Sequence, residues 1–218
     1  MLEKLPPFVG HALANQRAGL DRILFHSVAL QHGTAEISLA SAAFSPGSQI
    51  PIQYTSDGIG VSPPLQWSGV PPAAVSLAMI VEDADSPTPE PLVHAIAVDI
   101  DPQLQGFDEN DITAESNQTP AHLGRNSFLK QTWLPPDPPP GHGVHHYAFQ
   151  IFALLPGDAF SESPGRKELM QAIQRRAIGS GCLIGTYRRE NTASVNDREN
   201  ERAIAEPQAA ANGALLPP

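Results

Sequence analysis

Short apolar runs, separated by clusters of Pro, Gly, Ser and Asp, dominate the middle of the chain. The runs are AEISLA, QIPIQYT, VSLAMIVED, VHAIAVDID and YAFQIFALL, and they are rich in β-branched and aromatic residues. Runs of this length between turn-forming residues are typical of β-strands. VSLAMIV and AFQIFALL are apolar almost throughout, which predicts strands that are covered on both faces. We therefore expect residues 35–190 to form a mainly β domain.

Within this domain one segment has the period of a helix. RKELMQAIQRRAI follows Pro164 and Gly165, and it places Leu169, Ile173 and Ile178 on one face. A last strand, LIGTYRR, is expected after a Gly-Ser-Gly turn.

The two ends of the chain differ from this central part. Residues 1–34 are expected to form a helical extension, because apolar residues recur at three- and four-residue steps from Leu13 to Ala29, although Gly19 weakens the pattern and is a point where it divides. Such a helix packs on the core or on a second subunit, and we expect a homodimer through it. Residues 191–218 are charge-rich and Ala-rich without a period, so we expect a disordered or loosely docked tail.

The composition of the chain argues against several classes of protein. The chain has 218 residues and a formal net charge of −10, which argues against nucleic-acid binding because that needs an excess of Lys and Arg. There is one cysteine, so no internal disulfide can form. No secretory signal and no apolar stretch of about 20 residues is apparent. We expect a soluble, cytoplasmic protein without membrane insertion.

Candidate chemistry first appears where the run VSLAMIVED ends. Asp83 and Asp85 lie two positions apart in VEDADSP, so in an extended chain they face the same side. Pro87 stops the strand, and the returning strand carries His94, which this path places beside the two carboxylates. A neighbouring carboxylate makes an imidazole easier to protonate. The alternatives are that the aspartates only form a turn and that the histidine is structural.

A second group of polar residues follows a proline-rich loop. LPPDPPPGHGVHHY has prolines that fix the backbone, and Gly141 and Gly143 permit positive φ. His145 and Tyr147 then face one side of the next strand, whereas His146 faces the other. A stiff rim above polar side chains lowers the ordering cost of binding a ligand. The loop can instead be a surface connector or a polyproline ligand for a partner protein. The histidine spacing fits no standard zinc pattern, so no metal and no cofactor are expected.

Four motifs, in order, resemble the phosphatidylethanolamine-binding protein family, in its bacterial Raf-kinase-inhibitor-like branch. They are FSPGSQIPIQYTSDGIGVSPPLQW, VEDADSP with the histidine after it, PPPGHGVHHYAFQIFAL and GCLIGTYRR, and they span roughly residues 38–190. The resemblance implies a central antiparallel sheet, a second smaller sheet and a few flanking helices. It also implies a pocket for phosphate-like anions, formed by Asp83, Asp85, Pro87, His94, Pro138, Pro139, His145 and Tyr147.

Some positions depart from the family pattern. Ala84, Ser86 and Ala95 replace a proline, an alanine and a tryptophan, and His146 replaces an arginine. Asp137 stands where a small residue is usual, and its carboxylate repels an anion if it points inward. The ligand preference is therefore expected to differ from that of the family.

The favoured function is non-catalytic binding of a small anion or phosphorylated head group. Two imidazoles would donate to the anion, an aspartate would hold a histidine ring from behind, and no catalytic residue is assigned. The binding requires His94 and His145 to share one cavity that opens to solvent. An alternative is an acid–base enzyme acting on a phosphoester or small carbonyl compound, although the chain has no Gly-x-Ser-x-Gly, phosphate-loop or His-Glu-x-x-His motif. A third alternative is a regulator of kinase signalling that docks an unidentified protein partner.

Overall fold

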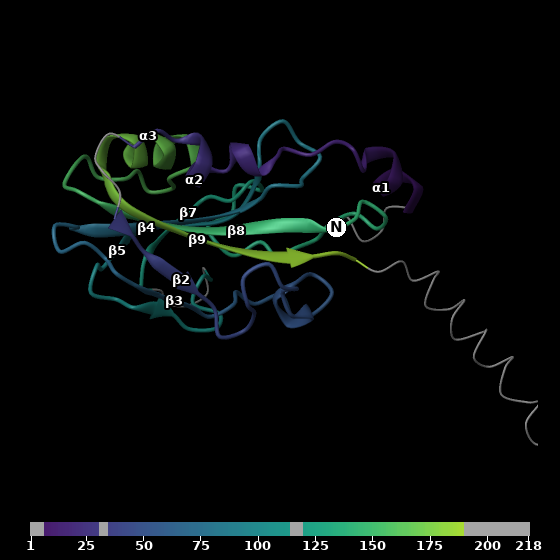
Figure 1. The fold of residues 1–218 in the computed structure, drawn as a ribbon, viewed down its shortest axis with the longest axis horizontal. Helices are drawn as coiled ribbons and strands as arrows, with labels where there is room; N and C mark the ends of the chain where they lie inside the picture. Colours follow the sequence, from purple (N-terminus) through teal and green to yellow (C-terminus); the bar gives the residue numbers. More distant parts are fainter. Residues whose placement is uncertain (1–6, 31–34, 114–119, 190–218) are drawn as a thin grey trace, which may run out of the picture.

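The computed structural model describes residues 7–30, 35–113 and 120–189, which form two β-sheets and a layer of short helices (Figure 1). A six-stranded sheet has the order β1-β9-β8-β4-β5-β7, and a three-stranded sheet has the order β2-β3-β6. The strands of the large sheet are β1 (Ala35–Glu36), β4 (Ser76–Asp83), β5 (Leu92–Ile100), β7 (His122–Gly124), β8 (His145–Leu154) and β9 (Ala177–Tyr187). Those of the small sheet are β2 (Ser38–Ala40), β3 (Leu65–Ser68) and β6 (Gly106–Phe107).

Strand pairing is antiparallel throughout both sheets, except that β1 runs parallel to β9. The helices are α1 (Pro7–Leu13), α2 (Leu24–Ser27) and α3 (Arg166–Arg176), with 3-10 turns η2 (Leu20–Arg22) and η3 (Ile52–Tyr54). The predicted mainly β fold, with a central antiparallel sheet, a smaller sheet and flanking helices, is confirmed.

The central strand β4 separates two hydrophobic layers by simple alternation. Leu77, Met79 and Val81 belong to the core between the two sheets. Ala78 and Ile80 belong to the core beneath α2 and α3. Full burial of such a side chain contributes roughly 1.5–3 kcal/mol, so a strand that is buried on both faces is a strong anchor for whatever lies at its end. The apolar runs VSLAMIV and AFQIFALL therefore lie in strands that are buried on both faces, as predicted.

Two local predictions in the β domain were wrong. QIPIQYT does not form a strand: Pro51 precedes the 3-10 turn η3, and the segment pairs with β9 through an isolated bridge between Gln49 and Thr186. Proline has no N–H for a ladder, which explains the interruption. The Gly-Ser-Gly sequence is not a turn, because β9 runs through it and already begins at Ala177, so Ile178 belongs to the strand and not to the helix. A Cβ on Gly181 would lie 2.1 Å from the carbonyl oxygen of Ile37, so this glycine permits close chain approach.

The N-terminal extension is helical only in short pieces, and the helical run is interrupted near Gly19, where the sequence pattern divides. The described part of the extension has three short helical turns, and between α1 and η2 the chain is not helical. Gly19 adopts φ 102°, a backbone conformation that residues with a side chain rarely adopt, and the helical run is interrupted there. Ile23 and Leu24 are fully buried, so this part of the extension packs on the core. Residues 1–6, 31–34 and the predicted tail at 191–218 lie outside the described residues.

Candidate functional site

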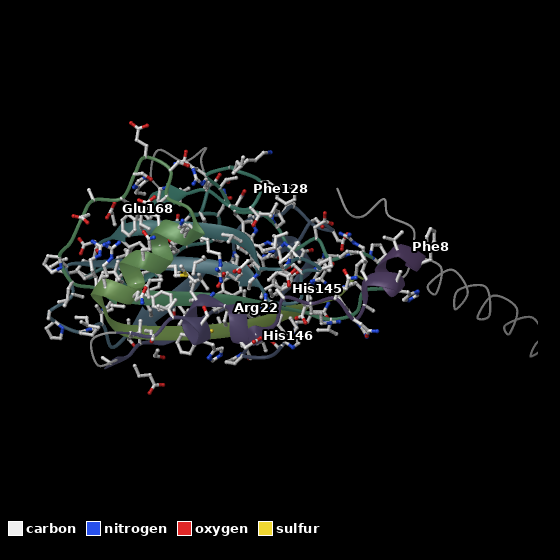
Figure 2. The ribbon with its side chains drawn as sticks, turned by 90° about the horizontal axis from the view of Figure 1, so that it is seen from above. Phe8, Arg22, Phe128, His145, His146 and Glu168 are labelled. Atoms are coloured by element: carbon white, nitrogen blue, oxygen red, sulfur yellow. The ribbon has the colours of Figure 1, made fainter. Side chains whose placement is uncertain are left out.

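Three strands of the large sheet bring polar side chains to one end of the molecule. β4 ends at Asp83, and β8 begins at His145, with Tyr147 paired directly opposite Asp83. The two labelled histidines His145 and His146 lie nearer to Phe8 of α1 than to Glu168 of α3 (Figure 2). His145 and Tyr147 share the face toward the small sheet, as the alternation along β8 predicts.

His94 reaches the same face through an irregularity in β5. Val81 pairs with Ala95 and Glu82 pairs with Val93, so His94 is an extra residue in the register between β4 and β5. An extra residue of this kind redirects its side chain. The His94 ring packs edge-on against the Tyr147 ring with centroids 5.1 Å apart, and the His145 and Tyr147 rings are 6.3 Å apart. His94 and His145 therefore flank the same tyrosine.

Two buried polar atoms at this point have no hydrogen-bond partner among the described residues: Nε2 of His94 and the hydroxyl of Tyr147. Nδ1 of His94 donates to the carbonyl oxygen of Leu134 at 2.6 Å. Burial lowers the pKa of His94, so the ring is neutral and its Nε2 carries a lone pair. Burial, followed by the charge of Asp83, raises the pKa of Tyr147 well above its usual value, so the phenol keeps its hydrogen. The pair offers one acceptor and one donor to a ligand.

The carboxylates do not flank His94 as the sequence suggested. Oδ2 of Asp83 accepts from Nδ1 of His145 at 2.8 Å, and Nε2 of His145 lies 2.6 Å from Nδ1 of His142. Nε2 of His142 donates to the carbonyl oxygen of Leu13 at 2.8 Å. Asp83 thus orients His145 from behind, whereas a backbone carbonyl orients His94. The charge of Asp83 raises the pKa of His94, as expected of a neighbouring carboxylate, but burial has the larger effect and the net pKa is lowered.

Asp85 faces away from Asp83 because strand alternation ends at β4. The chain turns at Ala84, and the Asp85 amide donates to Oδ1 of Asp83 at 2.8 Å. Oδ2 of Asp85 accepts from the backbone N–H and from Nδ1 of His146, both at 2.7 Å, and its Oδ1 pairs with Arg17. Burial raises the pKa of the Asp85 carboxyl, but the hydrogen bonds from Arg17 and His146 outweigh burial, and the net pKa is lowered.

The proline-rich loop forms the neighbouring wall. Pro138 and Pro139 are buried, Pro87 is half-buried in the β4–β5 turn, and Gly141 and Gly143 have φ of 81° and 100°, so the predicted positive φ is confirmed. The carbonyl oxygen of Pro139 accepts from the His142 amide at 3.1 Å, which turns the chain toward β8.

The negative charge of Asp137 is paired with Arg189, so it is not an unpaired charge beside the site. Its Oδ1 lies 2.8 Å from Nη1 of Arg189 and accepts from the Ser56 hydroxyl at 2.9 Å. Arg189 also pairs with Asp57, which accepts from the Tyr187 hydroxyl at 2.6 Å.

Three residues of this site were not assigned a role from the sequence. Arg189 is the arginine of the closing Tyr-x-Arg motif, so its position was visible although its partners were not. His142 lies in the proline-rich segment beside His145, but nothing in its spacing indicates a role, and among the described residues no group of His, Cys, Asp or Glu is arranged to hold a metal ion. Arg17 gave no local signal, because its contacts lie 68 and 125 residues away in the chain.

The site is nearly closed in this structure. His94 and His145 are 3% and 1% exposed, so the expectation that their shared cavity opens to solvent is wrong for the described residues. Two cavities lie elsewhere: one of about 710 Å³ is lined by β2, β3 and β6, and an apolar groove of about 510 Å³ lies beside Phe128 and Arg166. Because His94 and Tyr147 are buried, a ligand reaches them only if a covering segment moves.

Comparison with protein families gives one match that covers most of the chain. The model described as phosphatidylethanolamine-binding protein matches residues 40–188. A UPF0098 protein of Pyrococcus abyssi is 36% identical over 162 residues, which are 72% of this chain and 89% of that protein. LppC of Mycobacterium tuberculosis, named as a candidate lipoprotein, is 35% identical over 153 residues, 69% of this chain and 72% of that protein.

Two solved structures have the same fold. The homologue CT736 of Chlamydia trachomatis has a TM-score of 0.64 and 32% sequence identity, and the match covers 72% of this chain and 99% of that one. YbcL of Escherichia coli, described as a member of the mammalian family, has a TM-score of 0.66 and 26% identity over 71% of this chain and 99% of that one. No helix among the described residues is long and apolar enough to cross a bilayer. The cytoplasmic location stays a prediction, since one relative is named as a lipoprotein.

Proposed function

This chain belongs to the phosphatidylethanolamine-binding protein family, and we propose that it binds a small phosphate-like anion or phosphorylated head group, without converting it, between His94 and Tyr147. The observation that carries the proposal is the pair of buried polar atoms without partners. A buried polar group that lacks a hydrogen bond costs roughly 1–3 kcal/mol. A ligand that satisfies both atoms removes this cost, which favours binding.

The protonation states of the two side chains specify the ligand further. Tyr147 donates a hydrogen, whereas neutral His94 accepts one at Nε2. A monohydrogen phosphate or a singly protonated phosphate monoester has both a P–O acceptor and a P–OH donor, so it satisfies both atoms at once. Sulfate has the same shape but no hydrogen at neutral pH. We therefore expect the site to prefer phosphate over sulfate.

A non-catalytic role is supported by the groups around the pair. Both ring nitrogens of His145 are already hydrogen-bonded, so neither is available as a base. Burial raises the pKa of Cys182, the one cysteine of the chain, to about 12, which removes it as a nucleophile.

The test is a phosphate titration of the full chain by calorimetry and by amide chemical shifts, beside a sulfate titration at the same ionic strength. The Tyr147→Phe variant keeps the ring but lacks the donor. A hydrogen bond to a charged group contributes about 1.5–3 kcal/mol, so phosphate affinity should fall roughly 10- to 150-fold. Tyr54→Phe removes a buried ring's hydroxyl that contacts Glu109, and it should leave affinity unchanged. Absence of heat and of shifts at saturating phosphate would contradict the proposal.

A further inference from the structure

The segment Leu13–Gly19, called here the docking segment, crosses the end of the sheet that holds the site. The backbone N–H groups of Ala18 and Gly19 donate to the carbonyl oxygens of Ser86 and Ala84 at 3.1 and 2.7 Å. Arg17 pairs with Asp85 and also donates to the carbonyl oxygens of Val144 and His142, at 2.8 and 3.1 Å. The docking segment is therefore fixed to both β-turn regions that carry the site.

A count of hydrogens shows that this docking needs one proton. Three consecutive hydrogen bonds join Leu13, His142, His145 and Asp83. The Leu13 carbonyl and the Asp83 carboxylate are acceptors, so the three bonds together need three hydrogens. Two neutral imidazoles and a carboxylate supply only two. The complete chain of bonds exists only when one further proton has been taken up.

The added proton lies at the His145–Asp83 end of this series of hydrogen bonds. Burial, and then the neighbouring charge of His145, lowers the pKa of His142, so His142 is the neutral member and accepts at Nδ1. His145 then donates from both nitrogens, to His142 and to Asp83. Without the Leu13 carbonyl, two bonds remain and the two neutral rings supply both hydrogens. Release of the docking segment and loss of the proton are thus the same event.

This arrangement also affects the ligand site, because Nε2 of His145 is already hydrogen-bonded to Nδ1 of His142. In the neutral ring that atom is an acceptor, so the P–OH hydrogen of a phosphate can bond to it, but only after His142 has moved. His142 is 1% exposed, and the Leu13 carbonyl holds its far nitrogen. We propose that the docking segment closes the anion site by a proton-linked contact, so that docking competes with anion binding and is released as the pH rises. This inference rests on the function proposed above.

Other ionisable groups around the two histidines do not reverse this direction. The groups that interact with these two histidines, or with the neighbouring His94 of β5 and Tyr147 of β8, are Asp83 of β4, Tyr187 of β9, Arg17, Asp85 and Asp137. Tyr147 and Tyr187 have raised pKa values and stay neutral below pH 9. The Asp85 carboxyl has a lowered pKa, so its bond to Arg17 breaks only in acid. His94 is neutral above pH 7, because its pKa is lowered.

The docking test measures hydrogen exchange at the amides of Ala18 and Gly19 in the full chain between pH 6 and 9, corrected for the intrinsic exchange rate. Uptake of one proton predicts that the docking equilibrium falls by up to about tenfold per pH unit. In the variant Asp83→Asn the side-chain amide supplies the third hydrogen to His145, and its oxygen can still accept from the Asp85 amide, so no added proton is needed and its profile should be flat. His122→Gln, at a partly exposed histidine beside Asp99, should behave like the parent chain. Protection that does not change with pH in the parent chain would overturn the inference.

The coupling test measures phosphate affinity after the docking segment is loosened. Arg17→Gln should lose amide protection at Ala18 and bind phosphate several-fold more tightly, whereas Arg175→Gln on the exposed face of α3 should do neither. Gly19→Ala is an independent variant, because its φ is 102° and a Cβ there would lie 2.3 Å from Oδ1 of Asp21. Lost protection with unchanged phosphate affinity would overturn the coupling. Absence of phosphate binding at every pH, with pH-dependent protection retained, would instead remove only the proposed function.

Discussion

Burial of His94 makes its charged form costly, and the stability of the protein should therefore depend on pH. The pKa of His94 is lowered in the folded state, whereas an unfolded histidine titrates near its ordinary value of about 6.5. As the pH falls below that value, the unfolded chain takes up a proton that the folded chain refuses. The contribution is fully present above about pH 6.5 and is lost as the pH falls toward the lower folded pKa.

The prediction is that the free energy of unfolding falls between pH 7.5 and 5.5 by up to roughly 1.4 kcal/mol per pH unit for this one proton. Urea unfolding at both pH values measures it. His94→Gln should show a smaller fall, and the remainder belongs to groups such as His142, whose pKa is also lowered. The same fall in parent and variant would mean that His94 does not contribute.

At the level of single residues, the sequence predicted the facing of His145 and Tyr147 but not the partners of the carboxylates. Alternation along β8 is a local rule, and it holds throughout that strand. Asp85 lies just beyond the end of β4, where the rule no longer applies. His94 sits at a register shift, which depends on how two strands pair and has no local signature. The contacts of Arg17 join distant segments, so no pattern near it could indicate them.

Among the elements, β9 is the one whose glycines decide the packing. Gly181 lies in the strand interior, and a Cβ there would meet the carbonyl oxygen of Ile37 at 2.1 Å. Backbone cannot retreat as easily as a flexible side chain. Gly181→Ala should therefore lower the free energy of unfolding by about 1–3 kcal/mol, the usual cost of overpacking.

Denaturant unfolding measures this cost, and Ser180→Ala at the adjacent position is the control. Ser180 is partly exposed, and its described link to Ile37 uses only its backbone carbonyl, so its substitution should cost little. Equal stabilities of the two variants would show that the chains near Ile37 can separate without penalty.

Element prediction succeeded where the apolar run was long. β4, β5 and β8 are 8, 9 and 10 residues long, and each was found from its run. β6 and β7 have 2 and 3 residues, which is too short to show a period of two. The glycines of β9 looked like turn residues, because glycine in a turn and glycine at a close approach of two chains give the same sequence signal.

For the whole molecule, one buried carboxylate joins the N-terminal extension, the large sheet and α3. Glu82 is fully buried, and its Oε2 accepts from the Leu24 amide at 2.9 Å and from Gln150 at 2.8 Å. Its Oε1 pairs with Arg166 at 2.6 Å, and Arg166 also donates to the carbonyl oxygen of Arg22 at 2.7 Å. The extension thus satisfies polar groups that the sheet would otherwise leave buried.

These contacts make the N-terminal extension part of the same folded unit as the large sheet, although the extension is not one helix. α1, with Phe8 70% exposed, is the part of the extension that projects away from the sheet (Figures 1 and 2). The structure describes a single chain, so the predicted homodimer through this segment stays a prediction. Among the described residues of the extension, the buried side chains begin further along, at Ala18, and include Ile23 and Leu24.

Glu82→Ala should therefore destabilise the whole molecule and not only the extension. The change removes the carboxylate acceptor of the Leu24 amide and of Gln150, and it removes the buried one of the two carboxylates that pair with Arg166. Breaking a buried ion pair costs about 3–5 kcal/mol. Arg166 is 20% exposed, and water can replace part of the lost pairing, so we expect the lower end of this range. Urea unfolding measures the loss, and amide exchange at Leu24 follows the extension separately.

The matched control is Glu90→Ala, which removes the other carboxylate of Arg166. Glu90 is 64% exposed, and exposed pairs contribute only about 0–1 kcal/mol, so its loss should hardly change the unfolding curve. If Glu82→Ala costs no more than Glu90→Ala, the buried network does not hold the extension. If instead Leu24 loses protection while the strand β8 keeps its own, the extension unfolds independently and the unit is smaller than we infer. Loss of both together is the expected result, because Glu82 lies in the central strand and every segment it joins depends on that strand.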